Sequence, residues 1–287
     1  MSIQIKEKPV TVKCIKRKKE IGEKITMLTA YDYSTAKYVD ESGTDIILVG
    51  DSLGMTVLGY ENTLNVTMEE MTIFTKAVAR GSKRSLIVTD MPFMSYHVSR
   101  EQAVLNAGSL IQSGAQAVKI EGANEFIIDI VKHLTSCGIA VMGHLGFTPQ
   151  YINSIGGYFV QGKSYENTMK LMEDAKKLEE AGAFAIVLEM IPEETAQCIK
   201  DNLNIPTIGI GAGRHCDGQV LVLDDVIGRY SDFTPKFAKK YTDMKTIMVD
   251  ALKAYVLEVK NNSFPSDEHT FKLNPEENRK LADYFNK

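Results

Sequence analysis

The sequence predicts a single α/β domain, a (β/α)8 TIM barrel with a short N-terminal segment and a C-terminal helical tail. Short β-branched segments alternate with helical patterns over about 200 residues, which is typical of a parallel sheet. The spacing is regular and no linker interrupts it, so a closed barrel is favoured over an open, doubly wound sheet. No GxGxxG motif follows the first strand, which weakens a dinucleotide-binding interpretation. We expect the barrel to cover residues 1–261 and the tail to cover 262–287.

Eight strands are expected, most of them short runs rich in β-branched residues. They cover residues 25–30, 45–50, 85–91, 117–121, 140–145, 185–190, 206–210 and 219–224. Helical patterns between them cover 67–81, 100–112, 124–136, 165–181 and 193–202. The first of these helices opens with Thr67 and Glu70 in the spacing of a capping box. The polar tail after Asn261 is expected to form a short helix or arm packed on the surface.

Composition and charge indicate an ordinary globular protein. The 287 residues are 44% hydrophobic and 24% charged, which allows a sizeable core and a soluble surface. The formal net charge of −4 gives no overall attraction for nucleic acid or anionic membrane, and we expect neither as a partner. The basic run at 13–19 has no interleaved aromatic residue to stack on bases, so it is expected to be a solvated face.

The cysteines and the chain's first residues favour a cytoplasmic location. The four cysteines, Cys14, Cys137, Cys198 and Cys216, are far apart and form no CxxC pair. This argues against a disulfide framework or structural zinc site and fits a reducing compartment. Residues 1–13 hold no apolar run resembling a signal peptide, and no stretch approaches the roughly 18 consecutive apolar residues of a membrane-spanning helix.

Five of the expected strands end in an ionisable residue. In a (β/α)8 barrel the chemistry lies at the carboxyl ends of the strands, so these positions are candidates for a site. They are Asp51, Asp90, Glu121, His144 and Glu189.

Side chains alternate between the two faces of a strand, and this alternation indicates which of them point into the barrel. It groups Asp51 with Ile47 and Val49, Asp90 with Leu86 and Val88, and Glu189 with Ala185 and Val187. Lys119 and Glu121 also share a face, with Val118 and Ile120 turned toward the helices. Because residues two apart lie roughly 7 Å from each other, Lys119 and Glu121 are expected to line adjacent levels of one pocket.

Acidic residues on three consecutive strands suggest a metal site. A single Asp or Glu after a strand is more often a helix cap or a loop hydrogen-bonding residue. Three carboxylates gathered without compensation would be electrostatically costly, and a cation would remove that cost. Oxygen ligands without cysteine favour Mg²⁺ or a similar divalent ion, held by Asp51, Asp90 and Glu121. The glycine-rich segment 209–213 is compatible either with a phosphate site or with a tight turn.

Several phrases of the sequence together resemble the ketopantoate hydroxymethyltransferase (3-methyl-2-oxobutanoate hydroxymethyltransferase) family. They are TAYDYSTAKYVDESGTDIILVGDSLGM at 29–55, TDMPFMSY at 89–96, GAQAVKIEG at 114–122, MGHLGFTPQ at 142–150, GGYFVQGK at 156–163, VLEMIPEE at 187–194 and GIGAGRHCDGQVLV at 209–222. The resemblance spans roughly residues 8–250, and the series in this order is highly specific. Departures at Tyr60 and at Asp224–Asp225, where the family commonly has His and His-Asp, touch neither the expected metal nor the expected base.

The resemblance implies a role for each matching residue. It implies that Asp51, Asp90 and Glu121 hold the metal, and that Glu189 accepts a proton. It also implies a substrate-binding set of Asp51, Ser52, Asp90 and Lys119. No step is assigned to His144.

The resemblance further implies an activity: transfer of a hydroxymethyl group from 5,10-methylenetetrahydrofolate to 3-methyl-2-oxobutanoate. The product would be 2-dehydropantoate, a precursor of pantothenate, formed through a metal-stabilised enolate with Mg²⁺ as cofactor and the folate as co-substrate. The implied assembly is a homo-oligomer, possibly a decamer. Two alternatives are another Mg²⁺-dependent 2-oxo acid lyase or mutase of the phosphoenolpyruvate type, and a non-catalytic barrel. The first usually carries a Cys-Gly-His loop, which this sequence lacks.

Overall fold

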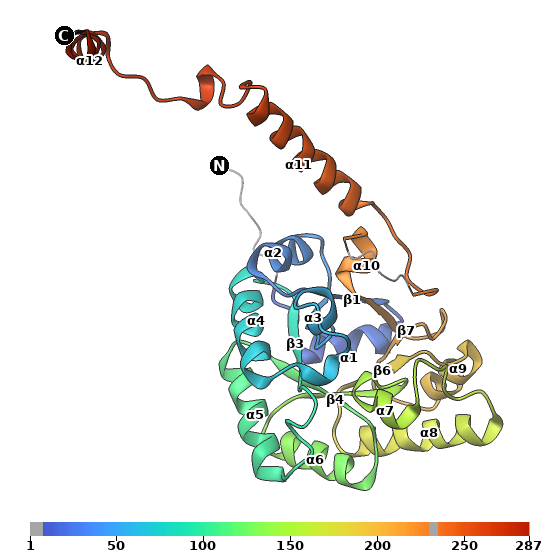
Figure 1. Cartoon of the computed structure of the whole chain (residues 1–287). Helices are drawn as coiled ribbons and strands as arrows, with labels where there is room; N and C mark the ends of the chain where they lie inside the picture. The colour runs from blue at the N-terminus through green and yellow to red at the C-terminus, as the bar shows by residue number, and fades with distance from the viewer. Residues whose placement is uncertain (1–7, 230–234, 287) are drawn as a thin grey trace.

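The computed structural model describes residues 8–229 and 235–286, and its centre is a closed barrel of parallel strands in the order β1 to β8 (Figure 1). The predicted (β/α)8 fold is therefore confirmed. The strands are β1 (Ile25–Thr29), β2 (Ile46–Val49), β3 (Leu86–Asp90), β4 (Ala117–Glu121), β5 (Val141–Gly146), β6 (Ala185–Glu189), β7 (Thr207–Ile210) and β8 (Gly218–Leu221). The predicted strand at 219–224 runs too far, because α10 (Leu223–Ile227) already begins at Leu223.

Helices surround the barrel, and the five predicted from the sequence are all present. They are α4 (Met68–Gly81), α5 (Arg100–Gln112), α6 (Glu125–Ser136), α8 (Tyr165–Glu180) and α9 (Glu193–Asp201). At the start of α4, Thr67 and Glu70 form the predicted capping box. Five further elements carry no signal that predicts them from the sequence: α2 (Tyr33–Glu41), α3 (Leu53–Thr56), α7 (Ile152–Ile155), η1 (Thr63–Asn65) and η2 (Pro149–Tyr151).

Alternate side chains of the strands fill the barrel interior, and the others pack against the surrounding helices. The interior cluster includes Ile25, Met27, Ile46, Leu48, Leu86, Val88, Ala117, Met142, Ala185, Val187, Ile208, Ile210 and Val220. The predicted orientation is correct on β3, β4 and β6 but wrong on β2, where Ile47 and Val49 face the helices. Asp51 reaches the barrel mouth because the chain turns after Val49, not because it continues the alternation of β2.

Helix α1 (Val12–Ile21) packs against the amino-terminal end of the barrel. Its Ile15 is fully buried in the interior cluster. Lys18 Nζ lies 2.9 Å from Asp45 Oδ1, and Lys19 Nζ lies 3.0 Å from Asp217 Oδ2. The prediction of a solvated basic face is thus wrong for Lys18 and Lys19, because aspartates preceding β2 and β8 pair with them.

Beyond the barrel, α11 (Met244–Lys260) leads away from it and α12 (Pro275–Phe285) ends the described chain (Figure 1). Neither helix has a buried residue, and residues 267–286 are all exposed. The prediction that the tail packs on the surface of its own barrel is therefore wrong. Among the described helices, none combines the length and apolarity needed to cross a membrane. Residues 1–7, on which part of the signal-peptide prediction rests, lie outside the described residues.

Candidate active site

The predicted strand-end residues come together at the carboxyl end of the barrel. Asp51, Asp90, Lys119, Glu121 and His144 are all buried, with at most 5% of each residue exposed. Because α1 packs at the opposite end, this end is the one available to a substrate.

A turn after β2 places Asp51 beside Asp90. The backbone N–H of Leu53 donates to the Gly50 carbonyl, which bends the chain at the strand end. The backbone N–H of Asp51 then donates to Asp90 Oδ2 at 3.1 Å. Position 50 has little room for a side chain, because a Cβ there would lie 2.9 Å from Ser52 Oγ and 3.5 Å from Asp90 Oδ2. Glycine at this position therefore allows the two aspartates to approach each other.

Lys119 is the cation at the centre of the cluster. Its Nζ lies 3.1 Å from Asp90 Oδ1 and 3.9 Å from Glu121 Oε1. Lys119 and Glu121 thus share one pocket, as their spacing on β4 predicts. Burial alone would lower the pKa of Lys119, but the surrounding carboxylates, Asp90 first, raise it above its usual value. Lys119 is therefore positively charged at neutral pH.

Gln150, from η2, is the main connector that the sequence analysis missed. Its side-chain Nε2 donates to Asp51 Oδ2 and to the Met91 carbonyl, both at 2.9 Å. Its backbone N–H donates to Glu121 Oε2 at 2.9 Å. Its Oε1 accepts from the Tyr96 hydroxyl at 2.7 Å, and that hydroxyl accepts in turn from the Glu121 N–H at 3.2 Å. Gln150 therefore connects the carboxylates of β2 and β4.

His144 links this cluster to Glu189. Its Nδ1 lies 3.2 Å from Lys119 Nζ, and its Nε2 lies 3.2 Å from Glu189 Oε2. Burial and the charge of Lys119 lower the pKa of His144, so the ring is neutral at neutral pH. Nδ1 also lies 3.3 Å from Glu121 Oε1, so the ring stands between the two carboxylates of Glu121 and Glu189. The Glu189 side chain is the least buried of the set at 15% exposed.

The electrostatics of the cluster are unbalanced. Burial raises the pKa of Asp51 well above its usual range, and the charges of Asp90 and Glu121 raise it further. Burial also raises the pKa of Asp90 and of Glu121, although Lys119 opposes both shifts. Three carboxylates face one ammonium, which leaves two negative charges without a partner when all are ionised.

Sequence comparisons give the family of the chain. The model of the ketopantoate hydroxymethyltransferase family matches residues 9–267. The 3-methyl-2-oxobutanoate hydroxymethyltransferase of Clostridium novyi (strain NT) is 57% identical over 264 residues, covering 92% of this chain and 96% of that protein. This chain belongs to the ketopantoate hydroxymethyltransferase family. A protein of the same name from Carboxydothermus hydrogenoformans is 54% identical over 93% of this chain and 97% of its own length.

Solved structures that resemble this member of the ketopantoate hydroxymethyltransferase family share its fold at low sequence identity. A phosphonopyruvate hydrolase structure, determined with oxalate and Mg²⁺, has a TM-score of 0.59 and 11% identity, covering 95% of this chain and 98% of that one. 2,3-Dimethylmalate lyase, a member of the PEP mutase/isocitrate lyase superfamily, has a TM-score of 0.56 and 14% identity, with coverages of 95% and 98%. At such identities the likeness shows the barrel fold alone.

The carboxylate cluster fits a divalent cation chemically. Asp90 Oδ1 and Glu121 Oε1 are buried, and the one cation beside them among the described residues is Lys119, whose Nζ they share at 3.1 and 3.9 Å. Oxygen donors with excess negative charge suit a hard cation. No three His, Cys, Asp or Glu side chains in the described ranges form a preformed metal-binding group. Mg²⁺ often retains several waters and few protein ligands, so the two observations are compatible.

Ser52 and the glycine-rich segment 209–213, the two remaining candidates for the site, both pack closely against neighbouring residues. Ser52 Oγ lies 2.8 Å from the hydroxyl of buried Tyr31, beside Asp51. In the segment 209–213, a Cβ on Gly211 (φ 62°) would lie 2.7 Å from the Phe237 ring. This close contact supports the tight-turn interpretation of the glycines.

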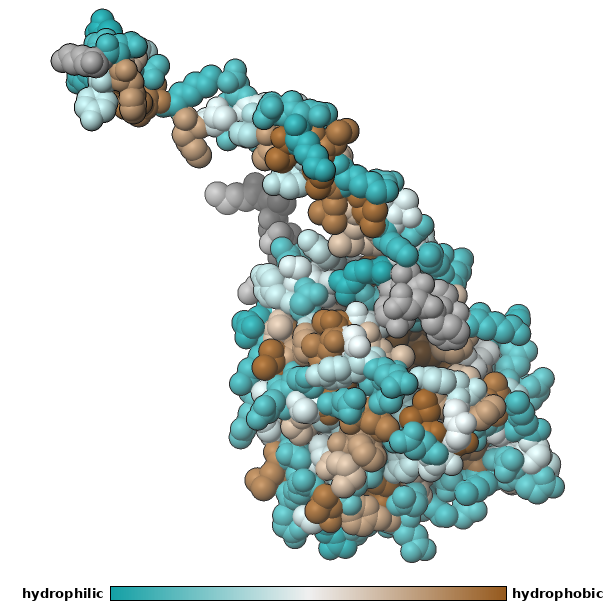
Figure 2. Space-filling view, in the orientation of Figure 1, coloured by the Kyte–Doolittle hydropathy of each residue, from teal (hydrophilic) through white to brown (hydrophobic). Residues whose placement is uncertain are grey.

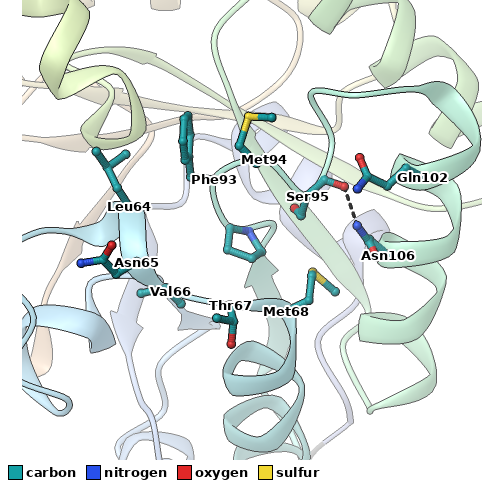
Figure 3. A pocket seen from close by; sticks show the side chains of 11 residues that line it. Leu64, Asn65, Val66, Thr67, Met68, Phe93, Met94, Ser95, Gln102 and Asn106 are labelled. Atoms are coloured by element: carbon teal, nitrogen blue, oxygen red, sulfur yellow. Dashed lines mark hydrogen bonds between the residues drawn. The ribbon is translucent and has the colours of Figure 1, made fainter.

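A cavity of about 460 Å³ lies outside this cluster, between the start of α4 and the loop after β3 (Figure 3). Leu64, Phe93, Met94 and Gln102 are among the residues that line it. None of the predicted site residues lines it, so it is distinct from the carboxylate cluster. The residues that sequence reasoning missed at the cluster, Gln150 above all, come from a loop, where neither periodicity nor charge marks them.

Proposed function

We propose that this chain transfers a hydroxymethyl group from 5,10-methylenetetrahydrofolate to 3-methyl-2-oxobutanoate, forming 2-dehydropantoate for pantothenate synthesis. The family match and the names of relatives that are 54–57% identical support this activity. The observation that carries the proposal is the arrangement of a buried carboxylate–lysine cluster joined through His144 to the partly exposed Glu189.

The acidic cluster would bind the cation and the polar end of the 2-oxo acid. Asp51, Asp90 and Glu121 would hold a divalent ion, directly or through water, and Mg²⁺ suits their oxygen atoms. When bound, such an ion would draw electron density from the keto oxygen and make the C3 proton more acidic. Lys119, kept charged by its acidic neighbours, would neutralise the negative charge that develops on the substrate oxygen.

Glu189 would remove the C3 proton. His144 Nε2 lies 3.2 Å from the Glu189 carboxylate and would help to position it toward the substrate. The C3 electron pair would then form the new bond to the one-carbon unit. Water would supply the hydroxyl group. The donor's two carbon–nitrogen bonds would break, and it would leave as tetrahydrofolate with the C3 proton and the second water proton on its nitrogens. Ser52 would contact the substrate next to Asp51.

Deuterium exchange at C3 of 3-methyl-2-oxobutanoate tests this assignment without the folate. The wild-type protein with Mg²⁺ should catalyse exchange, and a chelator should stop it. Glu189→Gln should reduce the exchange rate by about 100-fold or more, the typical contribution of a general base. Binding of the 2-oxo acid, measured by calorimetry, should change little because Glu189 contacts only the reacting end.

A matched control is Glu179→Gln on α8, whose carboxylate accepts from backbone N–H groups of Asn204 and Ile205 away from the site. This variant should exchange at the wild-type rate. Full exchange by Glu189→Gln would remove Glu189 from the base role, and exchange that is indifferent to the chelator would reject the metal scheme.

We propose in addition that the enzyme is a cytoplasmic homo-oligomer. Its four cysteines are free thiols, which fits a reducing compartment. The exposed apolar residues of α11 support association with further copies.

A further inference from the structure

The loop between α7 and α8 presents aromatic side chains that the chemistry above does not use. Tyr158 and Phe159 are each 56% exposed, and the neighbouring Val160 is 38% exposed. Adjacent large apolar side chains on a surface are characteristic of a contact site for a ligand or another protein. This loop follows β5, so it lies at the carboxyl end of the barrel together with the carboxylate cluster.

Glycines give the loop its conformation. Gly156 and Gly157 have φ values of 84° and 132°, in the region that residues with a Cβ rarely adopt. A Cβ on Gly157 would lie 3.2 Å from the Phe159 ring, so the ring packs over the bare glycine backbone. The Phe159 N–H also donates to the Gly157 carbonyl at 3.1 Å. The backbone thus holds the Phe159 ring in place while leaving more than half of the residue exposed.

Backbone hydrogen bonds and a ring contact attach this loop to the expected catalytic base. The Gln161 N–H donates at 2.9 Å to the carbonyl of Met190, the residue after Glu189. The Tyr158 ring packs on the buried Phe147 ring with 5.1 Å between centroids, and the Phe147 N–H donates to the Glu189 carbonyl at 2.8 Å. The exposed aromatic surface is therefore attached to the backbone that carries Glu189 and Met190.

We propose that Tyr158 and Phe159 form the surface on which the planar, reduced pterin ring of the one-carbon donor stacks. This inference rests on the proposed function, because that reaction needs a second, large substrate. The carboxylate cluster is nearly closed, whereas Glu189 is its partly exposed member. The donor therefore approaches C3 of the 2-oxo acid from the Glu189 side, where Tyr158 and Phe159 are each more than half exposed. Aromatic rings bind flat heterocycles by stacking without demanding a specific hydrogen-bond pattern.

Tyr158→Ala and Phe159→Ala test the proposal. Each variant should raise the KM for 5,10-methylenetetrahydrofolate by about tenfold, the order expected for loss of one stacking ring. Each should leave the folate-independent C3 exchange within about twofold of the wild-type rate, because the carboxylate cluster and Glu189 remain intact. Calorimetric binding of tetrahydrofolate gives a second readout that does not depend on turnover, and circular dichroism checks the fold.

Tyr165→Ala is the matched control. Tyr165 is 75% exposed and stands only a few residues along the chain, but it belongs to the first turn of α8 and not to the loop. The KM for the donor should not change in this variant.

The possible outcomes separate the two proposals. Wild-type transfer with unchanged donor KM and tetrahydrofolate affinity in Tyr158→Ala and Phe159→Ala would overturn the stacking surface alone. A change in oligomer mass without a change in donor affinity would also overturn it, since the rings would then be a subunit contact. Absence of both exchange and transfer in the wild-type protein would instead reject the proposed function. In that case the binding of tetrahydrofolate decides on the stacking surface independently. Wild-type binding that Tyr158→Ala and Phe159→Ala weaken would support the surface, and a wild-type protein that does not bind tetrahydrofolate would overturn it.

Discussion

Gln150 shows how a neutral side chain can organise several charged ones. Its side-chain amide and backbone N–H contact Asp51, Met91, Tyr96 and Glu121 in one connected set of hydrogen bonds. Gln150 is 3% exposed, so an unpaired amide at this position would be costly, and every side-chain contact has a defined direction. We therefore regard Gln150 as a positioning residue for the carboxylates that are expected to hold the metal.

Gln150→Met should weaken divalent-cation binding by about 10- to 100-fold, the usual effect of removing a partner that orients a metal ligand. Methionine has a similar length but cannot donate to Asp51 or accept from Tyr96. The measurement is titration with Mg²⁺ in the presence of 3-methyl-2-oxobutanoate, with kcat and KM recorded in parallel. Gln112→Met, at an exposed position at the end of α5, is the control and should bind Mg²⁺ normally.

A loss of thermal stability without any change in Mg²⁺ affinity would assign Gln150 a purely structural role. The side-chain amide is the feature under test, because the backbone N–H bond to Glu121 persists in the variant.

The sequence could predict the charged members of the site but not their connectors. Asp90, Lys119, Glu121, His144 and Glu189 stand on strands, where alternation and the barrel architecture locate them. Gln150 stands in a 3-10 turn, and its contacts depend on how three separate loops fold over the barrel mouth. Such distant packing leaves no periodic signal in the sequence.

At the scale of secondary structure, the strands could be predicted from their repeating pattern, whereas the packing of the first helix could not. Every predicted strand is present because a helix follows each strand except β7, and each of these repeats supports the same fold. On β2 the predicted orientation was wrong. All four residues of this strand are apolar and buried, so the sequence does not show which alternate pair faces the barrel interior and which faces the helices. The sequence predicts a solvated basic face for α1 because the aspartates that pair with Lys18 and Lys19 lie far along the chain.

Ile15→Ala tests whether α1 is an integral part of the barrel. Ile15 is fully buried in the interior cluster, so truncation should lower the free energy of unfolding by about 2–5 kcal/mol. Urea denaturation followed by circular dichroism measures this change. Activity per folded molecule should be retained, because α1 lies at the end of the barrel opposite the carboxylate cluster.

Ile21→Ala provides the comparison on the same helix. Ile21 is 54% exposed, and its truncation should cost far less than that of Ile15. Equal and small losses for the two variants would mean that α1 is a detachable segment.

At the scale of the whole molecule, α11 carries more apolar surface than a single chain covers. Figure 2 shows hydrophobic side chains along the arm that projects from the barrel. Met248, Leu252, Tyr255 and Val259 recur at helical spacing and are all between 43% and 61% exposed. A helix this apolar gains stability by packing against another surface, and we expect that surface to belong to a second copy of the chain.

Leu252→Glu combined with Tyr255→Glu should therefore dissociate the assembly. Two charges on the apolar stripe would have to be buried without partners, which typically costs several kcal/mol, enough to shift the association constant by orders of magnitude. Light scattering during size-exclusion chromatography should give a multiple of the 31.9 kDa chain mass for the wild type and a smaller species for the variant. Lys253→Gln, on the polar side where Lys253 Nζ lies 3.7 Å from Asp250 Oδ1, should leave the mass unchanged. A monomeric wild-type protein, or a variant with wild-type mass, would show that α11 does not mediate association.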